Sequence, residues 1–428
     1  MNKPEKKRDI FVYADWKEVQ GPIFMGTLHA ELVRGKEVFS FDYEDEWLQS
    51  EHAQLIDPDL QLFSGVHYLN YEDKTNFGLF LDSSPDRWGR ILMRRREAAI
   101  SRKEGRPEQN LFETDYLLGV YDGHRMGGLR FKSEKGGPFL NDNKKLASPP
   151  WTSIRELEQI SLRLEDSDVI NDPEYLNWLN MLVAPGSSLG GGRPKASVID
   201  NERQLWIAKF PSKSDQSDMG GWEILTYQLA IAAGLNMAES MAKKFSNSHH
   251  TFLTKRFDRN KEGARIHFAS AMTLLGHTDG QHHDDGVSYL ELVDFITTQG
   301  ARADEDLEEL WRRIVFSICV ANTDDHLRNH GFILTKTGWV LSPAYDINPV
   351  ETGTGLKLNI SENDNALDLD LAMEVHEYFR LNKKRANEII ERVKSSVKNW
   401  RKIARQYGIS SAEQELKSRA FQQGCLNQ

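Results

Sequence analysis

The apolar residues of this chain change their spacing along its length. Between residues 9 and 45, the segments "DIFVYADW", "GPIFMGTLHAELV" and "EVFSFDY" alternate apolar and polar residues and are separated by glycine and charged turns. Such alternation is typical of β-strands with one buried face. After Gly263, apolar residues instead recur every three or four positions, as they do in helices. Strand runs followed by helix runs indicate an α+β fold.

Other segments can be interpreted in the same way. Residues 75–120 have helical spacing, with "DRWGRILMRRREAAI" behind a Ser-Ser-Pro-Asp start, and residues 133–150 predict a loop or boundary. The segments "KASVID" and "QLWIAKF" predict two strands around a turn at 201–202. Apolar residues between Leu307 and Ile318 predict one buried helix, and those between Ala386 and Ile403 another, ended by Gly408.

Composition narrows the class of protein. A chain of 428 residues with 39% hydrophobic content can bury a substantial core in two or three domains. Only Cys319 and Cys425 occur, which excludes a disulfide framework and favours a reducing cytoplasm. The charged N-terminus and the absence of long apolar runs argue against a signal peptide or membrane span. A net charge of -10 disfavours a large nucleic-acid surface, so we expect any contact with DNA to be indirect.

The segment "NTDDHLRNHGF", residues 322–332, directly follows a predicted buried helix. Asp324 and Asn329 are five residues apart, the separation between the catalytic Asp and the metal-binding Asn of protein kinases. Asp346 lies seventeen residues beyond Asn329, at the end of the strand-like run "WVLSPAYDI". Oxygen ligands on neighbouring loops suit Mg²⁺ held against nucleotide phosphates. Taken alone, the motif fits equally well a solvated loop that polar residues turn and cap.

A glycine-rich segment lies upstream of this loop. The stretch "GSSLGGGRPKASV" has four glycines just before a predicted strand, and Lys209 follows in the strand "WIAKF". Glycine N–H groups can approach phosphates closely, and a strand lysine can neutralise them. No Walker A motif is present, and the alternative is a flexible hairpin. Glu223, fourteen residues beyond Lys209, opens an apparent amphipathic helix and could pair with Lys209. Alternatively, it is an acid in the first helical turn, where the helix dipole favours a negative charge.

Several motifs in order resemble one family, the HipA-type serine/threonine kinase toxins of bacterial toxin–antitoxin systems. They are "GPIFMGTL", "SPDRWGR", "LLGVYDGHRMGGLRF", "SSLGGGRPKASV", "WIAKFPS", "TKRFDR", "ANTDDHLRNHGF" and "LSPAYDI". The resemblance runs through most of the chain and implies a protein-kinase-like bilobal fold. It implies a β-rich N-terminal accessory subdomain over residues 1–145, a kinase N-lobe with the glycine-rich loop over 146–265, and a helical C-lobe over 266–428.

The resemblance also implies roles by position. Asp324 corresponds to the catalytic base, Asn329 and Asp346 to Mg²⁺ ligands, and Lys209 to a ligand of the nucleotide phosphates. The remaining positions are the phosphate-loop residues Gly191, Gly192 and Lys195, and the backbone around Arg256 and Phe257 as the hinge that grips adenine. His326, two residues after the proposed base, is better explained as an imidazole that braces the loop than as a proton carrier.

The glycine segment contains two adjacent serines. In the family, a serine just before the loop is autophosphorylated, and Ser188 stands three residues before Gly191, where the resemblance implies this site. Ser187 next to it is the alternative. A phosphate there would compete with the nucleotide phosphates for the same N–H donors.

The function that the resemblance implies is an ATP- and Mg²⁺-dependent cytoplasmic protein kinase that acts as a toxin. It implies a helix-turn-helix antitoxin that supplies DNA binding, and an aminoacyl-tRNA synthetase is a reasonable protein substrate. We expect no membrane partner. Two alternatives remain, namely a kinase-fold enzyme that phosphorylates a small molecule or lipid, and a nucleotide-binding regulator without kinase activity.

Two further segments could carry other chemistry. The stretch "HTDGQHHDDG" contains His277, His282, His283, Asp284 and Asp285, which could bind a transition metal, although a polar loop is the better-supported interpretation. The stretch "RWGRILMRRRE" has five arginines between residues 87 and 96 that could face an acidic partner. A solvated helix face is the commoner outcome for such a pattern.

Overall fold

The structure is a computed structural model that describes residues 7–70, 74–182, 191–246 and 249–422. The chain divides into two compact units. The first unit comprises Met1–Lys213 and Arg256–Thr278, and the second comprises Ser214–Lys255 and Asp279–Gln428. Each unit therefore contains two separate stretches of the sequence.

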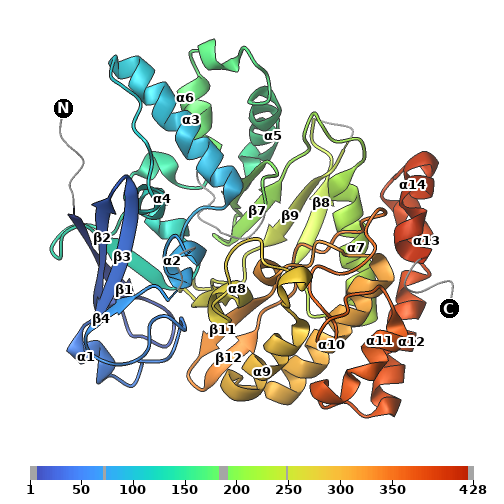
Figure 1. Ribbon diagram of the computed structural model, residues 1–428. Helices are drawn as coiled ribbons and strands as arrows, with labels where there is room; N and C mark the ends of the chain where they lie inside the picture. The colour runs from blue at the N-terminus through green and yellow to red at the C-terminus, as the bar shows by residue number, and fades with distance from the viewer. Residues whose placement is uncertain (1–6, 71–73, 183–190, 247–248, 423–428) are drawn as a thin grey trace. The chain divides into compact units, whose positions relative to one another are not determined.

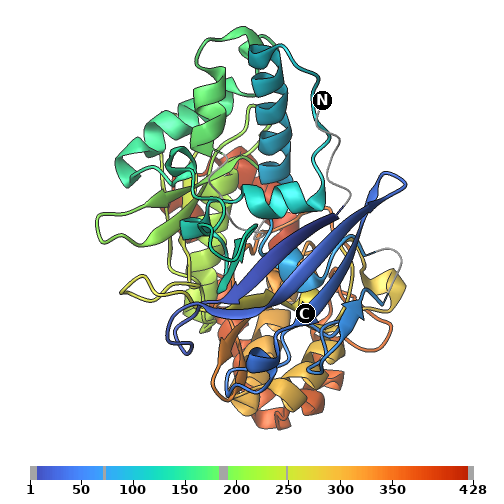
Figure 2. The same ribbon diagram turned by 90° about the vertical axis from the view of Figure 1, so that its left-hand side faces the viewer.

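The first unit is built on a five-stranded antiparallel sheet in the order β4-β3-β2-β1-β5 (Figures 1 and 2). Its strands are β1 (Lys7–Ala14), β2 (Ile23–Val33), β3 (Lys36–Tyr43), β4 (Val66–Tyr68) and β5 (Leu129–Lys132). Alternate residues such as Val12 and Phe41 are fully buried, and Phe41 packs against Phe80 of a short helix. The three strands predicted over residues 9–45 are confirmed.

Helices and a hairpin complete the first unit. The helices are α1 (Asp45–Leu48), α2 (Gly78–Asp82), α3 (Arg87–Glu104), α4 (Glu113–Gly119), α5 (Ile154–Arg163), α6 (Tyr175–Leu182) and α8 (Ala271–Leu274), and the remaining strands are β6 (Lys195–Ile199), β7 (Leu205–Lys209) and β10 (Phe268–Ser270). Asp86 caps the start of α3, because its carboxylate accepts a hydrogen bond from the Gly89 N–H at 2.9 Å. The predicted helical region and the predicted β6–β7 hairpin are thus confirmed.

The compact units do not coincide with the three segments expected from the sequence. Residues 146–213 group with the N-terminal part because long-range hydrogen bonds tie them to α3. The Trp88 Nε1–H donates to the Lys195 carbonyl oxygen at 3.0 Å, and Arg96 Nε donates to Asn180 Oδ1 at 2.6 Å. Such contacts join residues about a hundred positions apart, which no local sequence pattern reports.

The second unit is mainly helical. Its helices are α7 (Met219–Ala233), α9 (Tyr289–Gln299), α10 (Ala303–Val320), α11 (Leu369–Glu374), α12 (Lys383–Val397), α13 (Trp400–Gln406) and α14 (Ser411–Gln422). Two antiparallel hairpins accompany them, β8 (Ser240–Lys243) with β9 (Thr251–Lys255), and β11 (Gly331–Thr335) with β12 (Gly338–Leu341). Short 3-10 turns in the two units are at Asp122–His124, Lys144–Leu146, Trp151–Ser153, Val169–Asn171, His283–Asp285, Leu327–Asn329 and His376–Phe379.

The helices of the second unit confirm some expectations and correct others. The apolar residues that predicted the helix over 307–318 are all buried in α10. The apolar pattern over 386–403 belongs to two helices, because the chain breaks at 398–399, and Gly408 follows α13 with a φ of +66°. In the described part of the chain, no helix has the length and apolar character that crossing a bilayer requires.

Candidate active site

The loop after α10 begins at a strained residue. Ala321 has a left-handed φ of +49°, and the next N–H, that of Asn322, returns to the Ser317 carbonyl oxygen at 2.9 Å. The Ala321 carbonyl in turn accepts a hydrogen bond from the Val350 N–H at 3.0 Å. A left-handed conformation is costly for a residue with a Cβ and persists only where surrounding contacts fix it. The backbone that leads into "NTDDHLRNHGF" is therefore held firmly.

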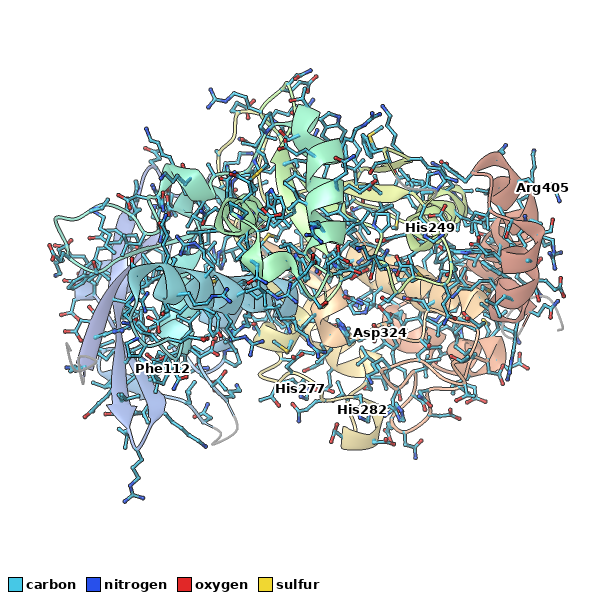
Figure 3. All side chains as sticks on the ribbon, turned by 90° about the horizontal axis from the view of Figure 1, so that it is seen from above. Phe112, His249, His277, His282, Asp324 and Arg405 are labelled. Atoms are coloured by element: carbon cyan, nitrogen blue, oxygen red, sulfur yellow. The ribbon has the colours of Figure 1, made fainter. Side chains whose placement is uncertain are left out.

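The two adjacent carboxylates of this loop have opposite environments. Asp324 is exposed and is labelled in Figure 3, whereas Asp325 is only 4% exposed. The Tyr289 hydroxyl donates to Asp325 at 2.5 Å, and His330 Nε2 lies 3.1 Å from its other oxygen. Burial alone would raise the pKa of Asp325, but His330 and Tyr289 outweigh it and lower that pKa. Asp325 thus anchors the loop as a buried carboxylate, and Asp324 is the one that can meet a substrate.

Asn329 lies in the 3-10 turn that closes the same loop and is buried. Its Nδ2–H donates to the Asp324 backbone carbonyl at 3.0 Å, and the His326 N–H donates to the same carbonyl at 3.0 Å. An amide whose nitrogen is committed in this way can present only its oxygen to a metal ion. This hydrogen bond also fixes the distance between Asp324 and Asn329, the two residues whose separation in the sequence matches that of the kinase residues.

Asp346 lies on a second loop that is fastened to the first. The β12 strand ends at Leu341, so Asp346 does not end a strand as the sequence suggested, and its φ is +57°. Just before it, the Ala344 N–H donates to the Asn236 carbonyl at 2.7 Å. The neighbouring Tyr345 hydroxyl donates to the Arg328 carbonyl of the first loop at 2.8 Å. This hydroxyl holds the Asp346 loop against the loop that carries Asp324 and Asn329.

Glu223 and Asp346 line the same small pocket of the second unit. The walls of this pocket come from α7, the β8–β9 hairpin and the loop that carries Asp346. The lining also includes Tyr227, Thr254 and Tyr345. Glu223 is the fifth residue of α7 and is buried, so it is not an acid in the first helical turn, and α7 is buried on several sides instead of being amphipathic. The carboxylates of Glu223 and Asp346 offer this pocket hard, anionic oxygens, which suit Mg²⁺, although Met237 also lines it.

In the first unit, the two lysines of the sequence prediction face each other across a hairpin. Lys195 opens β6 and pairs in register with Lys209, the last residue of β7, and both are buried. The Lys195 ammonium lies 2.6 Å from Asp86 and donates to the Gly191 carbonyl at 2.7 Å. Lys195 therefore links Gly191 to Asp86, the residue that caps α3. Sequence reasoning missed Asp86 as its partner, although "SPDRWGR" contains it.

The glycine positions are open. Gly191 and Gly192 are exposed, and a Cβ built on Gly191 would meet no atom within 4 Å. Their φ angles lie outside the left-handed region, so local geometry does not require glycine at either place. Close approach of an external group remains as a reason for two glycines here. Ser187 and Ser188 lie outside the described residues.

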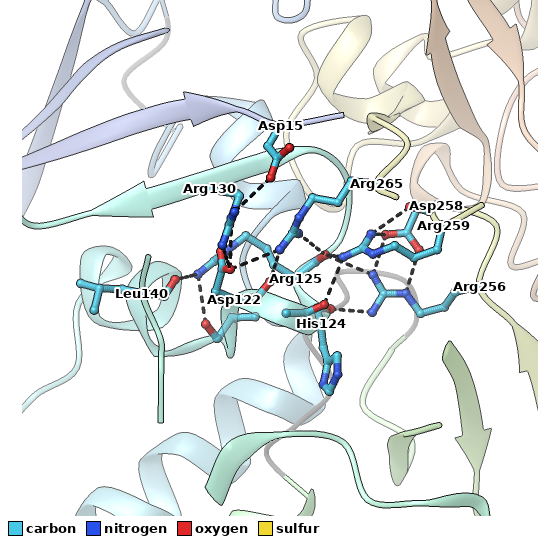
Figure 4. A network of polar contacts seen from close by, with 12 residues as sticks. Asp15, Asp122, His124, Arg125, Arg130, Leu140, Arg256, Asp258, Arg259 and Arg265 are labelled. Carbon is cyan, nitrogen blue, oxygen red and sulfur yellow. Dashed lines mark hydrogen bonds and ion pairs between the residues drawn. The ribbon is translucent and has the colours of Figure 1, made fainter. Parts of the chain in front are cut away.

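The segment expected to form the hinge is bound into a buried network of arginines and aspartates (Figure 4). The Arg256 guanidinium pairs with Asp258 and donates to the His124 carbonyl at 2.6 Å, and its backbone N–H donates to the Leu205 carbonyl at 2.9 Å. Burial alone would raise the pKa of Asp258, but Arg256 and Arg259 bring it down to about 2. The side chain of Arg256 thus has a structural role, while the ring of Phe257 packs at 5.8 Å from Phe268.

Two other segments, the histidine-rich stretch at 277–285 and the arginines of α3, are further candidates for a functional site in the sequence. Ligand atoms of His282, His283 and Asp284 lie within 4.8 Å of one another and could hold a metal, but these residues also cap a short turn, as a polar loop would. Arginines of α3 have partners inside the first unit, for example the bidentate contact of Arg90 with Glu113 at 2.6 and 2.7 Å. Both patterns therefore have ordinary structural explanations.

Relatives with known names share parts of this chain. The family model described as HipA-like C-terminal domain matches residues 187–400, which is half of the chain. A curated protein of Haemophilus influenzae named "Putative kinase" is 27% identical over 38% of this chain and 52% of its own length. A similarly named protein of Sinorhizobium fredii is 28% identical over 37% of this chain and 44% of its own. The chain thus spans about half the length of these curated relatives.

A solved structure resembles nearly the whole chain. It is the toxin–antitoxin complex of HipA, HipB and operator DNA from Shewanella oneidensis MR-1, with a TM-score of 0.64 and 18% identity. The match covers 97% of this chain and 95% of the other. At this identity the likeness shows the fold, and it confirms the α+β, kinase-like fold expected from the sequence. On the evidence of the family model and this fold, the chain belongs to the HipA-like family.

Proposed function

We propose that this protein is an ATP- and Mg²⁺-dependent serine/threonine protein kinase that acts as a bacterial toxin in the cytoplasm. The observation that carries the proposal is the pair of loops in the second unit. Asp324 is exposed, Asn329 is tied to the Asp324 carbonyl, and Tyr345 joins the Asp346 loop to the same segment. Phosphoryl transfer depends mainly on such positioning of oxygen groups.

Each candidate residue would have its own role in phosphoryl transfer. Asp324 accepts a hydrogen bond from the hydroxyl that is to be phosphorylated and so orients it. Asn329 and Asp346 offer the oxygens that would hold Mg²⁺, and bound Mg²⁺ neutralises charge on the phosphates. In the first unit, Lys209 and the open glycines Gly191 and Gly192 would receive the nucleotide phosphates, while backbone groups next to Phe257 would bind adenine. Lys195, in its contact with Asp86, supports the glycine segment.

The partners of the proposed function follow from the relatives. The HipA structure from Shewanella oneidensis was solved with HipB and operator DNA. We therefore propose that a HipB-like helix-turn-helix antitoxin neutralises this chain and provides the contact with DNA. An aminoacyl-tRNA synthetase is the proposed class of protein substrate, and Ser188, or Ser187 beside it, is the proposed site of autophosphorylation.

A radiolabel experiment tests the proposal. Purified protein and the Asp324→Asn variant are incubated with labelled ATP, Mg²⁺ and cell extract, and the products are separated into protein and small-molecule fractions. The proposal expects label in protein for the wild type alone. Label only in small molecules or lipids would favour a small-molecule kinase, and the absence of any transfer, together with binding of ATP, would favour a nucleotide-binding regulator.

A further inference from the structure

The last helix of the chain connects two parts of the candidate site. Glu413, Lys417 and Phe421 of α14 follow one another at intervals of four, so they lie on one face of the helix. Lys417 and Phe421 are buried, and Glu413 is half-buried, while Glu415 and Leu416 between them are exposed. Figure 1 draws this helix in red near the C-terminus. Each residue of the buried face makes a contact of a different kind.

The first contact is with the start of α7, the helix that carries Glu223. The Asp218 backbone N–H donates to Glu413 Oε2 at 3.0 Å. Asp218 is the residue that caps α7, because its carboxylate accepts from the Gly221 N–H at 3.0 Å. Glu413 thus holds the residue that fixes where α7 begins.

The second contact is with the loop that follows Asp346. The Lys417 ammonium donates to the Pro349 carbonyl at 3.2 Å and to Glu351 Oε2 at 2.5 Å. A buried ammonium is costly unless its hydrogen bonds are satisfied, so this lysine specifies the position of residues 349–351. The same stretch is bound to the end of α10 through the Val350 N–H. Lys417 therefore fixes the path of the chain a few residues beyond Asp346.

The third contact anchors the helix itself. The Phe421 ring stacks on Trp400 with a centroid distance of 4.4 Å and an angle of 9°, and lies 6.1 Å from the ring of Trp222. Trp222 is the residue directly before Glu223 and is 1% exposed. Phe421 thus packs the end of α14 against Trp400 of α13 and against Trp222 of α7.

We propose that α14 is a clamp that couples the position of α7, with Glu223, to the position of the Asp346 loop through Glu413 and Lys417. The consequence of this coupling is that α14 sets the affinity of the active site for Mg²⁺. This consequence rests on the proposed kinase function. Glu413 and Lys417 are positioning residues, since they touch the supports of Glu223 and Asp346 and not the reacting groups. A ligand or partner that displaced α14 would loosen both supports together.

Hydrogen–deuterium exchange of the full-length chain tests the coupling. Lys417→Met should speed exchange in peptides over residues 346–351 and also over 218–226 by about tenfold, the scale of a typical coupling between sites. Glu413→Ala should loosen the same two segments, including the distant 346–351. The matched controls are Glu415→Ala on the exposed face of α14 and Lys402→Met on α13, which should leave both segments unchanged. If each variant loosens only the segment that it touches, α14 is not a clamp.

Kinetics distinguish positioning from mere support of the fold. Lys417→Met should raise the Mg²⁺ concentration for half-maximal phosphoryl transfer by about tenfold, with the rate at saturating Mg²⁺ reduced less than about twofold. Lys417→Arg should restore most of the Mg²⁺ affinity, since it keeps the charge and the donors. An unchanged Mg²⁺ dependence in a folded, active Lys417→Met variant would overturn the inference.

The two proposals fail in different ways. A wild-type protein that transfers no phosphate to any acceptor would defeat the proposed kinase function, while the exchange measurement would still decide whether α14 couples the two segments. If Lys417→Met does not fold, Glu413→Ala carries the test through its effect on residues 346–351, and the Glu413→Ala, Lys417→Met pair is replaced by Glu413→Ala with Lys417→Arg.

Discussion

The candidate site residues of the two compact units differ in what surrounds their charges. In the second unit, Asp324 is exposed on a loop whose backbone is firmly held. In the first unit, the cations Lys195 and Arg256 are buried and already paired with Asp86 and Asp258. A charged residue that the motifs place at a kinase-like position can therefore either contact a substrate or stabilise the fold through a buried ion pair. Burial and partners distinguish the two roles, and the motif does not.

The largest expected effect is on catalysis at the exposed carboxylate. Asp324→Asn should reduce phosphoryl transfer by about 10³-fold or more, within the range for loss of a group that handles the substrate proton. Because Asp324 is exposed, the free energy of unfolding should change by less than about 0.5 kcal/mol. Initial rates with labelled ATP and a denaturant titration measure the two quantities.

The neighbouring carboxylate is the matched control for that variant. Asp325→Asn should instead lower stability, because it removes a buried charge from its contacts with Tyr289 and His330. If Asp325→Asn stopped transfer in a fully stable protein while Asp324→Asn remained active, the two roles would have to be exchanged.

The second prediction concerns the buried ion pair of the first unit. Asp86→Ala should cost roughly 3–5 kcal/mol of unfolding free energy, because it leaves the Lys195 ammonium buried without its carboxylate. It also removes the cap of α3. Denaturant titration measures the loss, and the added change Lys195→Met should recover part of it by removing the orphaned charge. An Asp86→Ala protein as stable as the wild type would contradict the structural role of this ion pair.

The third prediction tests the proposed role of Asp346 as a metal ligand. Asp346→Asn replaces an anionic oxygen ligand by a neutral amide, so the Mg²⁺ concentration for half-maximal transfer should rise by at least about tenfold. Binding of ATP without Mg²⁺ should change little. Isothermal titration with and without Mg²⁺ separates the two quantities, and an equal affinity for Mg²⁺-ATP in both proteins would remove Asp346 from the metal site.

The smallest expected effect is on the proposed self-modification. Ser188→Ala should remove most of the autophosphorylation signal, whereas Ser187→Ala should keep it. A phosphate at Ser188 would add about -1.5 to -2 charges three residues before Gly191 in the sequence, and Ser188→Asp should imitate this only in part. Mass spectrometry after incubation with Mg²⁺-ATP locates the phosphate. Phosphate mainly on Ser187, or on neither serine, would contradict the assignment.

Much of the fold could be predicted because its periodicity is local. Alternation gave β1 to β3 and the β6–β7 hairpin, and the three-and-four spacing gave α10. The break at 398–399 has no signal in the sequence pattern, because the apolar residues keep helical spacing across it. The pattern also predicts too long a strand at β12, because "SPAYDI" continues the apolar character beyond Leu341, where the strand ends.

The site was predicted less completely, for reasons of sequence distance. The difference between Asp324 and Asp325 depends on Tyr289, which lies 36 residues away from Asp325. The partner of Lys195 lies 109 residues away. Contacts of this kind are set by the tertiary structure, so the motif could identify the loop but not the environment of each carboxylate.

The division of the first unit into two stretches has a consequence for synthesis on the ribosome. Residues 122–130 contribute Asp122 and Arg125 to the network in Figure 4, but Arg256, Asp258 and Arg265 belong to the stretch that returns after residue 255. A nascent chain of 213 residues therefore contains the β-sheet and lacks the groups that bind the Arg125 and His124 carbonyls. We expect the first unit to complete its folding only after residue 278 has emerged, because contacts this distant in sequence form late.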